Sequence, residues 1–197
     1  MKYQQGKRDK RKMLRLFVGL YPPPGVVQQV AGILDGLDLP PYRATRTEQV
    51  HLTLYFIGDI PAAPSHHLES VIESVKRSSS GLSRFTLNPE ELIALPHGGA
   101  VRLLALRTDA PAELLELHSR LVRRLAERPR RNPSDRYHPH LTLCRFRSPQ
   151  ANPDLREMCQ SIPFRVDSFP VESVFLMQSH LHPDGAIHRE VMHTDLH

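Results

Sequence analysis

The feature that most constrains this chain is a tetrapeptide, His-Leu-Thr-Leu, that occurs twice, at residues 51–54 and 140–143. Each copy follows a strand-like segment and a helix-like segment. Phe17 lies 34 residues before the first copy, and Leu104 lies 36 residues before the second. Two copies of such a unit are too few for a solenoid and favour a duplicated module. The pattern predicts an α+β fold with two lobes related by a pseudo-two-fold axis and a cleft between them.

The order of residues within each copy predicts which side chains face that cleft. In a strand, residues i and i+2 lie on one face about 7 Å apart. His51 and Thr53 therefore point the same way, as do His140 and Thr142, while the leucines face the opposite side. Two such strands beside a pseudo-two-fold axis would gather two imidazoles and two hydroxyls around one point. The alternative is a pair of buried strands that carry polar residues by coincidence.

Two histidines and two threonines at one point favour chemistry at phosphorus. Histidine titrates near neutral pH, so one imidazole can act as a base while the other acts as an acid. Threonine hydroxyls can donate hydrogen bonds to phosphoryl oxygens. This set suits an in-line displacement in which one histidine activates the nucleophile and the other protonates the leaving oxygen. We therefore expect no metal and no other cofactor.

Three segments of the chain resemble a known family. They are Leu-Phe-Val-Gly-Leu at 16–20, Val-His-Leu-Thr-Leu-Tyr-Phe-Ile-Gly at 50–58, and Tyr-His-Pro-His-Leu-Thr-Leu-Cys-Arg at 137–145. The paired His-x-Thr-x motifs are similar to those of the 2H phosphoesterase superfamily. The flanking residues resemble the LigT-like (ThpR) RNA 2',3'-cyclic phosphodiesterases, long called 2'-5' RNA ligases. The resemblance covers residues 14–193.

The resemblance implies a fold, a reaction and four central residues. The fold would be the bilobal LigT-like one, with two antiparallel-rich sheets flanking a central cleft and helices outside. The reaction would be hydrolysis of RNA 2',3'-cyclic phosphate ends to 2'-phosphomonoesters, with ATP-independent 2'-5' ligation as its reverse. By this likeness His51 would protonate the departing 3' oxygen and His140 would activate water, although pseudo-symmetry allows the two roles to be exchanged. Thr53 and Thr142 would hold the phosphate.

The resemblance also implies two further contacts, from Arg145 to the phosphate and from Phe56, stacked on the terminal base. Strict alternation along each strand puts these two side chains on the faces opposite His140 and His51, so both assignments rest on likeness. The same alternation puts Cys144 on the face of His140. Because no dedicated base accompanies this thiol, we expect a small buried residue rather than a nucleophile.

Periodicity and turn residues predict the remaining elements. Helices are expected over 24–36, from an N-cap at Ser65 to about 78, and from Pro111 to about 125. Strands are expected at 14–20, 50–57, 85–87, 92–95, 101–107, 137–146, 164–166, 174–178 and 187–192.

Basic residues gather at the N-terminus and before the second motif. Residues 1–13 hold six lysines and arginines with one acidic residue, which predicts a flexible basic tail before a single domain over 14–197. The tail would either solubilise the protein or steer RNA. Arg128, Arg130, Arg131 and Arg136 form a second basic group, either a solvated loop or a contact to RNA phosphates. The net charge of +5 suits a polyanionic partner.

Composition excludes several classes of protein. No apolar run approaches the roughly 20 residues that span a bilayer. Two cysteines are too few for a disulfide framework and favour free thiols in a reducing cytosol. We therefore expect a cytoplasmic monomer with no membrane partner. The pairs His138/His140 and His180/His182 could hold a metal, but no acidic residue lies beside either of them.

Three functional hypotheses follow. The first is a metal-independent phosphodiesterase acting on RNA or nucleotide 2',3'-cyclic phosphate ends. The second is a related phosphodiesterase with another substrate, such as ADP-ribose cyclic phosphate or 2'-5' oligoadenylate. The third is an RNA- or nucleotide-binding module without turnover.

Overall fold

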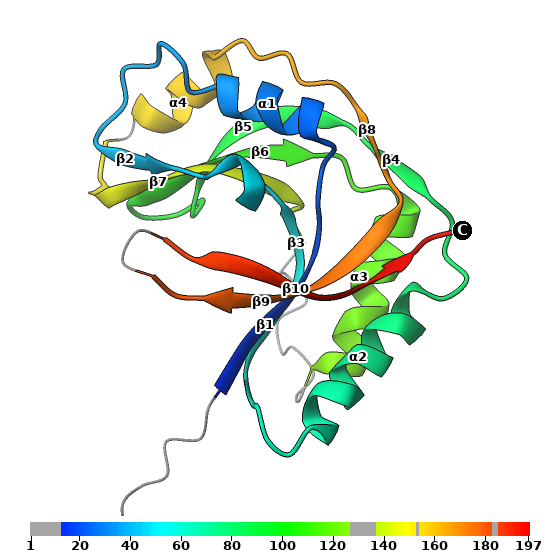
Figure 1. Ribbon diagram of the computed structural model, residues 1–197. Coiled ribbons are helices and arrows are strands. Elements are labelled where there is room, and N and C mark those ends of the chain that lie inside the picture. Colours follow the sequence, from blue (N-terminus) through cyan, green and yellow to red (C-terminus); the bar gives the residue numbers. More distant parts are fainter. Residues whose placement is uncertain (1–12, 127–136, 153, 183–184) are drawn as a thin grey trace, which may run out of the picture.

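The computed structural model describes residues 13–126, 137–152, 154–182 and 185–197 (Figure 1). The predicted basic tail, apart from Met13, and the predicted basic group at 128–136 lie outside these ranges. The described chain forms four α-helices, α1 (Pro24–Gly32), α2 (His66–Ser79), α3 (Ala112–Leu125) and α4 (Asp154–Ser161), and a 3₁₀ helix, η1 (Thr47–Gln49). Its ten strands are β1 (Met13–Leu20), β2 (Tyr42–Ala44), β3 (Leu52–Pro61), β4 (Phe85–Leu87), β5 (Pro89–Leu95), β6 (Val101–Thr108), β7 (His140–Gln150), β8 (Phe169–Val171), β9 (Ser173–His180) and β10 (Ile187–Asp195).

Eight of these strands form one antiparallel sheet in the order β10-β9-β1-β3-β7-β6-β5, with β2 also paired to β7. The two motif strands, β3 and β7, meet at the centre and are joined by one residue pair, Leu52 opposite Leu141. We call β10, β9, β1 and β3 the first lobe, and β7, β6, β5 and β2 the second lobe. The predicted pair of sheets is thus present as two halves of one sheet, whose strand ladders are joined by this one residue pair.

The two lobes repeat the same pattern of pairing. In the first lobe β1 lies antiparallel to β3, and in the second β6 lies antiparallel to β7, so each motif strand is the innermost of its lobe. A helix follows the first strand of each pair. This repetition agrees with the duplicated module that the sequence predicts.

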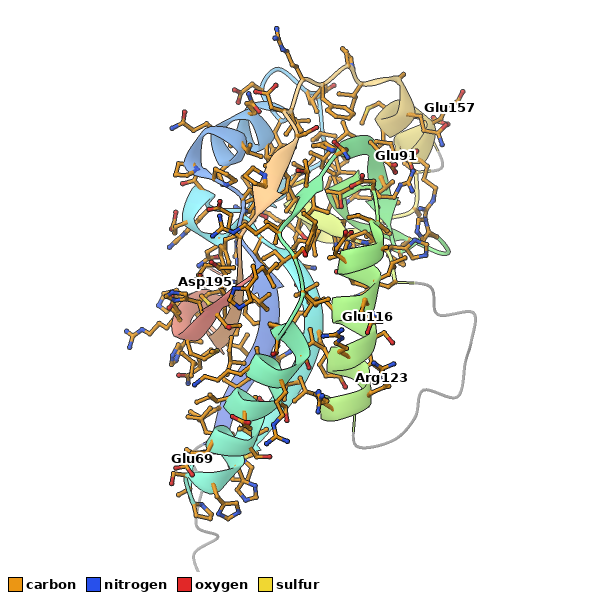
Figure 2. The ribbon with its side chains drawn as sticks, turned by 90° about the vertical axis from the view of Figure 1, so that its right-hand side faces the viewer. Glu69, Glu91, Glu116, Arg123, Glu157 and Asp195 are labelled. Atoms are coloured by element: carbon orange, nitrogen blue, oxygen red, sulfur yellow. The ribbon has the colours of Figure 1, made fainter. Side chains whose placement is uncertain are left out.

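Helices cover the outside of the lobes. The helix α3 follows β6 of the second lobe but packs against α2 and against β3 of the first (Figure 2). It is amphipathic: Leu114, Leu117 and Leu121 are fully buried, whereas Glu116 faces solvent and bonds Arg120 one turn later. In Figure 1, α1 and α4 lie at the end of the molecule that holds β5, β6 and β7.

A single contiguous apolar core joins the two lobes, and the motif leucines belong to it. Leu52, Leu54, Leu141 and Leu143 are each at most 3% exposed. Burial of four leucines fixes the faces of β3 and β7, because slipping either strand by one residue would turn these side chains into solvent. The alternation predicted within each tetrapeptide is therefore confirmed.

The structure differs from the predicted elements in a few places. The strand expected at 164–166 is wrong: Phe164 and Val166 pack on the core as a loop, and the strand lies at Phe169–Val171, where it pairs with Phe85–Leu87. The first helix ends at Gly32 and continues as tight turns to Gly36, which has a positive φ of 77°. The strand β2 and the helix α4 were not predicted. No helix in the described ranges is both long and apolar enough to cross a membrane.

Candidate active site

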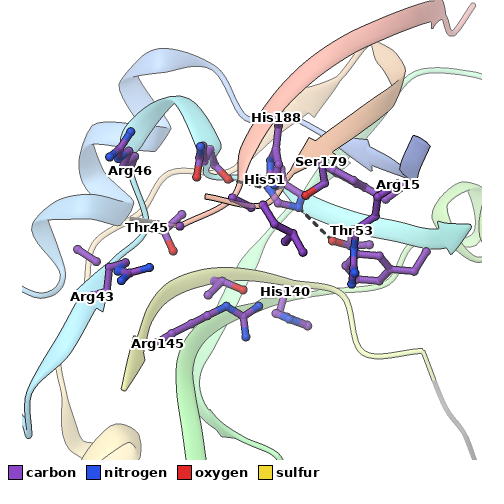
Figure 3. A pocket seen from close by; sticks show the side chains of 18 of the residues that line it. Arg15, Arg43, Thr45, Arg46, His51, Thr53, His140, Arg145, Ser179 and His188 are labelled. Carbon is purple, nitrogen blue, oxygen red and sulfur yellow. Dashed lines mark hydrogen bonds between the residues drawn. The ribbon is translucent and has the colours of Figure 1, made fainter. Parts of the chain in front are cut away.

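A cavity of about 950 Å³ lies where the two lobes meet (Figure 3). Strands of both lobes and the β9–β10 hairpin line it. All six residues that the sequence singles out are on its wall: His51, Thr53, Phe56, His140, Thr142 and Arg145. Tyr137, three residues before β7, ties this segment to β3, because its hydroxyl donates to the carbonyl oxygen of Thr53 (3.0 Å).

His51 stands between η1 and β3 with its ring held at both nitrogens. Its Nδ1–H donates to the carbonyl oxygen of Gln49 (2.7 Å), and its Nε2 lies 3.1 Å from the Thr53 hydroxyl. A carbonyl can only accept, so Nδ1 carries the hydrogen of the neutral ring and Nε2 accepts from Thr53. Nε2 is therefore the nitrogen that can exchange a proton.

His140 repeats this arrangement in the second lobe. Its Nδ1–H donates to the carbonyl oxygen of His138 (2.9 Å), two residues earlier, just as Gln49 lies two residues before His51. The same backbone bond selects the same tautomer in both halves. The pseudo-symmetry of the fold thus extends to the hydrogen bonding of the two rings.

The surroundings of both imidazoles favour the neutral form at pH 7 in the free protein. The pKa of His51 is lowered from 6.5 to about 4, chiefly by burial and to a smaller extent by the neighbouring His188, His140 and Arg145, although the bond to Gln49 raises it. Burial also lowers the pKa of His140, and Arg145 contributes to that shift as well. An anion bound between the rings would favour the charged form of either histidine and so raise these pKa values.

Aromatic side chains surround His51 and account for its burial. The Phe17 ring lies 4.9 Å away at 37°, the Tyr21 ring lies 5.6 Å away at 26°, and the His188 ring lies 4.9 Å away at 84°. Gly19 makes room for this group, since a Cβ there would lie 3.1 Å from the Leu52 carbonyl oxygen and 3.5 Å from His51 Cδ2. His188 lines the cavity from β10, and only the fold brings it there.

A β-bulge in β3 turns Phe56 toward the cavity. Gly19 is opposite Thr53 and Val18 is opposite Tyr55, so Leu54 has no partner of its own on β1. One extra residue reverses the alternation beyond it. Leu54 and Tyr55 consequently both pack on the core, and Phe56 lies on the cavity wall with 61% of its surface exposed.

The second lobe has the same bulge in β7. Ala105 is opposite Thr142 and Leu104 is opposite Cys144, which leaves Leu143 without a partner. Arg145 is therefore on the cavity side with His140, and the predicted placement of Arg145 and Phe56 on the opposite faces is wrong. Cys144 is fully buried in the core, so its predicted position on the His140 face is also wrong, whereas its predicted burial is confirmed.

The described wall of the cavity is strongly basic. Besides Arg145, it includes four arginines that the sequence analysis did not assign: Arg15, Arg43, Arg46 and Arg147. None of its described lining residues is an aspartate or a glutamate. Arg147 lies two residues after Arg145 and could have been found from it by alternation, once the resemblance put Arg145 at the phosphate. Arg15 lies two residues before Phe17, which the sequence did not place on the cavity. Arg43 and Arg46 depend on β2 and η1.

Neither cysteine lies on the described cavity wall, and both thiols are free and buried. Burial raises the pKa of Cys144 to about 11. In the part of the chain that the structure describes, no three His, Cys, Asp or Glu side chains come together in a group that could hold a metal ion.

Comparison with known proteins gives a consistent family. The family model of the 2'-5' RNA ligase superfamily matches residues 22–183. An RNA 2',3'-cyclic phosphodiesterase of Methanothermobacter thermautotrophicus is 27% identical over 148 residues, which cover 73% of this chain and 77% of the relative. A protein of the same name from Archaeoglobus fulgidus is 25% identical over 182 residues, 90% of this chain and 98% of the relative.

Solved structures show the same fold. E. coli LigT complexed with 3'-AMP superposes with a TM-score of 0.71 at 21% identity, covering 94% of this chain and 99% of LigT. A Thermus thermophilus protein gives a TM-score of 0.70 at 21% identity, covering 92% of this chain and 97% of that protein. The predicted α+β, LigT-like fold is therefore confirmed. Since the family model spans most of the sequence, the chain belongs to the 2'-5' RNA ligase superfamily.

Proposed function

We propose that this protein hydrolyses RNA 2',3'-cyclic phosphate ends to 2'-phosphomonoesters by two-histidine acid–base catalysis without a metal. The observation that carries the proposal is the pair of imidazoles on one basic cavity, each with Nδ1 bonded to a backbone carbonyl and Nε2 left for proton exchange. The archaeal relatives named RNA 2',3'-cyclic phosphodiesterases support the same substrate.

The reaction removes one proton from water and delivers one proton to the leaving 3' oxygen. Nε2 of His140 accepts a proton from water as the water oxygen bonds to phosphorus. Nε2–H of His51 donates its proton to the 3' oxygen as the bond from phosphorus to that oxygen breaks. The product carries its phosphate on the 2' oxygen, and proton exchange with solvent restores the starting state. Each positioned acid or base contributes about 10²- to 10⁴-fold to the rate.

Binding of substrate would favour the uptake, from solvent, of the proton that the free protein lacks. Both histidine pKa values are lowered in the free protein, so a doubly neutral pair predominates at pH 7. The cyclic phosphate is an anion, and its approach to the two rings favours protonation of one of them. The acid therefore forms in the complex, next to the oxygen that it must protonate.

The remaining residues of the proposed site hold the two ends of the nucleotide. The hydroxyls of Thr53 and Thr142 can donate to the nonbridging phosphate oxygens, and the guanidinium of Arg145 can bind them by charge-assisted hydrogen bonds. The exposed ring of Phe56 offers a stacking surface for the terminal base.

The division of labour between the histidines has a direct test. In a substrate whose 3' oxygen is replaced by sulfur, the leaving thiolate is a weaker base and needs no acid. This substrate should restore turnover to His51→Ala and leave His140→Ala inactive. Rescue of His140→Ala alone would instead reverse the two roles.

A substrate panel tests the specificity. Initial rates with a 2',3'-cyclic nucleotide, an ADP-ribose cyclic phosphate and a 2'-5' oligoadenylate should be highest for the first. A faster rate with either of the other two compounds would identify that compound, rather than RNA 2',3'-cyclic ends, as the preferred substrate. Tight binding of all three without turnover would identify a binding module.

We further propose that the protein acts in the cytoplasm as a monomer. The two free, buried thiols of Cys144 and Cys159 support a reducing compartment.

A further inference from the structure

The second lobe carries a group of arginines that one terminal phosphate does not require. The short strand β2 lies antiparallel to β7, with Arg43 directly opposite Arg145. Backbone bonds from Thr45 N to Leu143 O (2.8 Å) and from Arg147 N to Pro41 O (2.9 Å) continue this ladder beyond both ends of β2. The two strands therefore form a fixed support for the side chains they carry.

Three of these side chains lie on one face. Residues directly opposite each other in an antiparallel pair point the same way, as do residues i and i+2 of one strand. Arg43, Arg145 and Arg147 accordingly all reach the cavity wall, where Arg46 joins them from the residue before η1. Figure 3 shows Arg43 and Arg46 on the side of the cavity away from Thr53. We call Arg43, Arg46, Arg145 and Arg147 the arginine platform.

The charge of the platform points to an anionic ligand. Four guanidinium groups on one wall concentrate positive charge there. No carboxylate is among the described residues that line this cavity. Guanidinium groups bind phosphates through paired, charge-assisted hydrogen bonds, so they are the side chains best suited to a phosphodiester backbone.

The platform carries more positive charge than the terminal phosphate can neutralise. A 2',3'-cyclic phosphate carries one negative charge, and Arg145 is the platform residue that acts on both histidines. The first lobe contributes one arginine to the described wall, Arg15, because the position equivalent to Arg145 holds Phe56 and the one equivalent to Arg147 holds Gly58. The other extra guanidiniums lie together, along β2, before η1 and on the far part of β7.

We propose that Arg46, Arg147 and the rest of the platform bind the backbone phosphates of the nucleotides that precede the terminal one. The preferred substrate is then an oligoribonucleotide with a 2',3'-cyclic end rather than a cyclic mononucleotide. This inference rests on the proposed function for its choice of terminal group, and it adds the direction in which the RNA leaves the site.

The test compares two substrates in matched variants. Arg46→Gln, Arg147→Gln and the double variant are assayed with 2',3'-cyclic AMP and with an octaribonucleotide that ends in adenosine 2',3'-cyclic phosphate. Lys76→Gln, which removes one exposed charge from α2, is the control. Melting temperatures are measured for every variant to verify folding.

Each arginine variant should lower kcat/KM for the octamer by about tenfold and leave kcat/KM for cyclic AMP within about twofold. The slope of log KM against log salt for the octamer should fall by about 0.7 for each arginine removed. Equal losses of kcat/KM on both substrates, or no loss on the octamer beyond that of Lys76→Gln, would overturn the proposal that the platform binds the preceding phosphates.

A binding measurement separates this inference from the proposed function. If the wild-type protein turns over neither substrate, the proposed function fails. Fluorescence anisotropy with an octaribonucleotide ending in a 3'-phosphate still tests the platform. Binding weakened by about tenfold in Arg147→Gln would support it, and unchanged binding would overturn it.

Discussion

Phe56 and Arg145 occupy equivalent positions in the two halves of the chain, each five residues after its motif histidine and each turned toward the cavity by a bulge at the second motif leucine. The two halves therefore share one backbone geometry but present different chemistry, an aromatic ring on one side and a guanidinium on the other. In the proposed function, this difference assigns the base to the side of Phe56 and the phosphate to the side of Arg145.

Removal of the Phe56 ring should weaken binding more than catalysis. Stacking of a base on an aromatic side chain contributes about 1–3 kcal/mol, so Phe56→Ala should raise KM for 2',3'-cyclic AMP by about tenfold with little change in kcat. Phe56→Trp keeps a stacking surface and should restore KM. An unchanged KM in Phe56→Ala would contradict the assignment of this ring to the base.

The rate should fall as the solution becomes alkaline. The free protein has lowered pKa values at both His51 and His140, and turnover needs one proton on the pair. Above both pKa values, the singly protonated fraction decreases about tenfold per pH unit. Log kcat/KM for 2',3'-cyclic AMP, which reports the free enzyme, should therefore decline with a slope near −1 between about pH 7 and 8. A profile that rises over this range would refute the lowered pKa values.

The stability of the fold should decrease in mild acid because of His51. The pKa of His51 is about 4 in the folded chain, below its ordinary value of 6.5, so between these pH values the unfolded chain binds a proton that the folded chain does not. The free energy of unfolding therefore falls as pH drops from 6.5 to 4.

Urea unfolding at several pH values measures this effect. His51→Gln removes the titrating group and should show a shallower loss of stability over the same range. His66→Gln changes an exposed histidine on α2 and serves as the control. Equal slopes for all three proteins would mean that His51 is not the group responsible.

His188 should influence the protonation of His51. Its ring excludes water from His51, and its charge, when present, opposes that of His51. Both effects lower the pKa of His51, so His188→Ala should raise it toward 6.5. NMR titration of the His51 ring measures the shift, and His66→Ala should leave it unchanged. A His51 pKa that stays the same in His188→Ala would show that the remaining aromatic rings alone bury the imidazole.

The sequence alone predicts that the histidine and threonine of each motif share one face of their strand. His51 and Thr53 are two residues apart, and side chains at that spacing lie on the same face whichever strand pairs with theirs. It also predicts the two lobes, since Phe17 and Leu104 stand at nearly equal distances before the two motifs. These are local or repeated features. The structure confirms the alternation within both tetrapeptides, and it shows β1 paired with β3 and β6 paired with β7 in the two repeats.

The bulges could not be predicted in the same way. A bulge is a mismatch between two strands, so nothing in residues 50–58 alone reveals that Leu54 lacks a partner on β1. The strand β2 has three residues, too few for a period to be recognised, and its formation depends on the edge of β7. His188 reaches His51 because β9 and β10 extend the sheet beside β1, which is a result of topology.

In the proposed reaction, His51 and His140 open a 2',3'-cyclic phosphate without a metal. The most direct measurement is hydrolysis of 2',3'-cyclic AMP in excess EDTA, followed by phosphorus NMR, for the wild-type protein, His51→Ala and His140→Ala. We expect a 2'-phosphate product from the wild type and a loss of about 10²- to 10⁴-fold in each variant. A wild-type protein that is inactive in EDTA, a 3'-phosphate product, or a variant with undiminished turnover would contradict the proposed reaction.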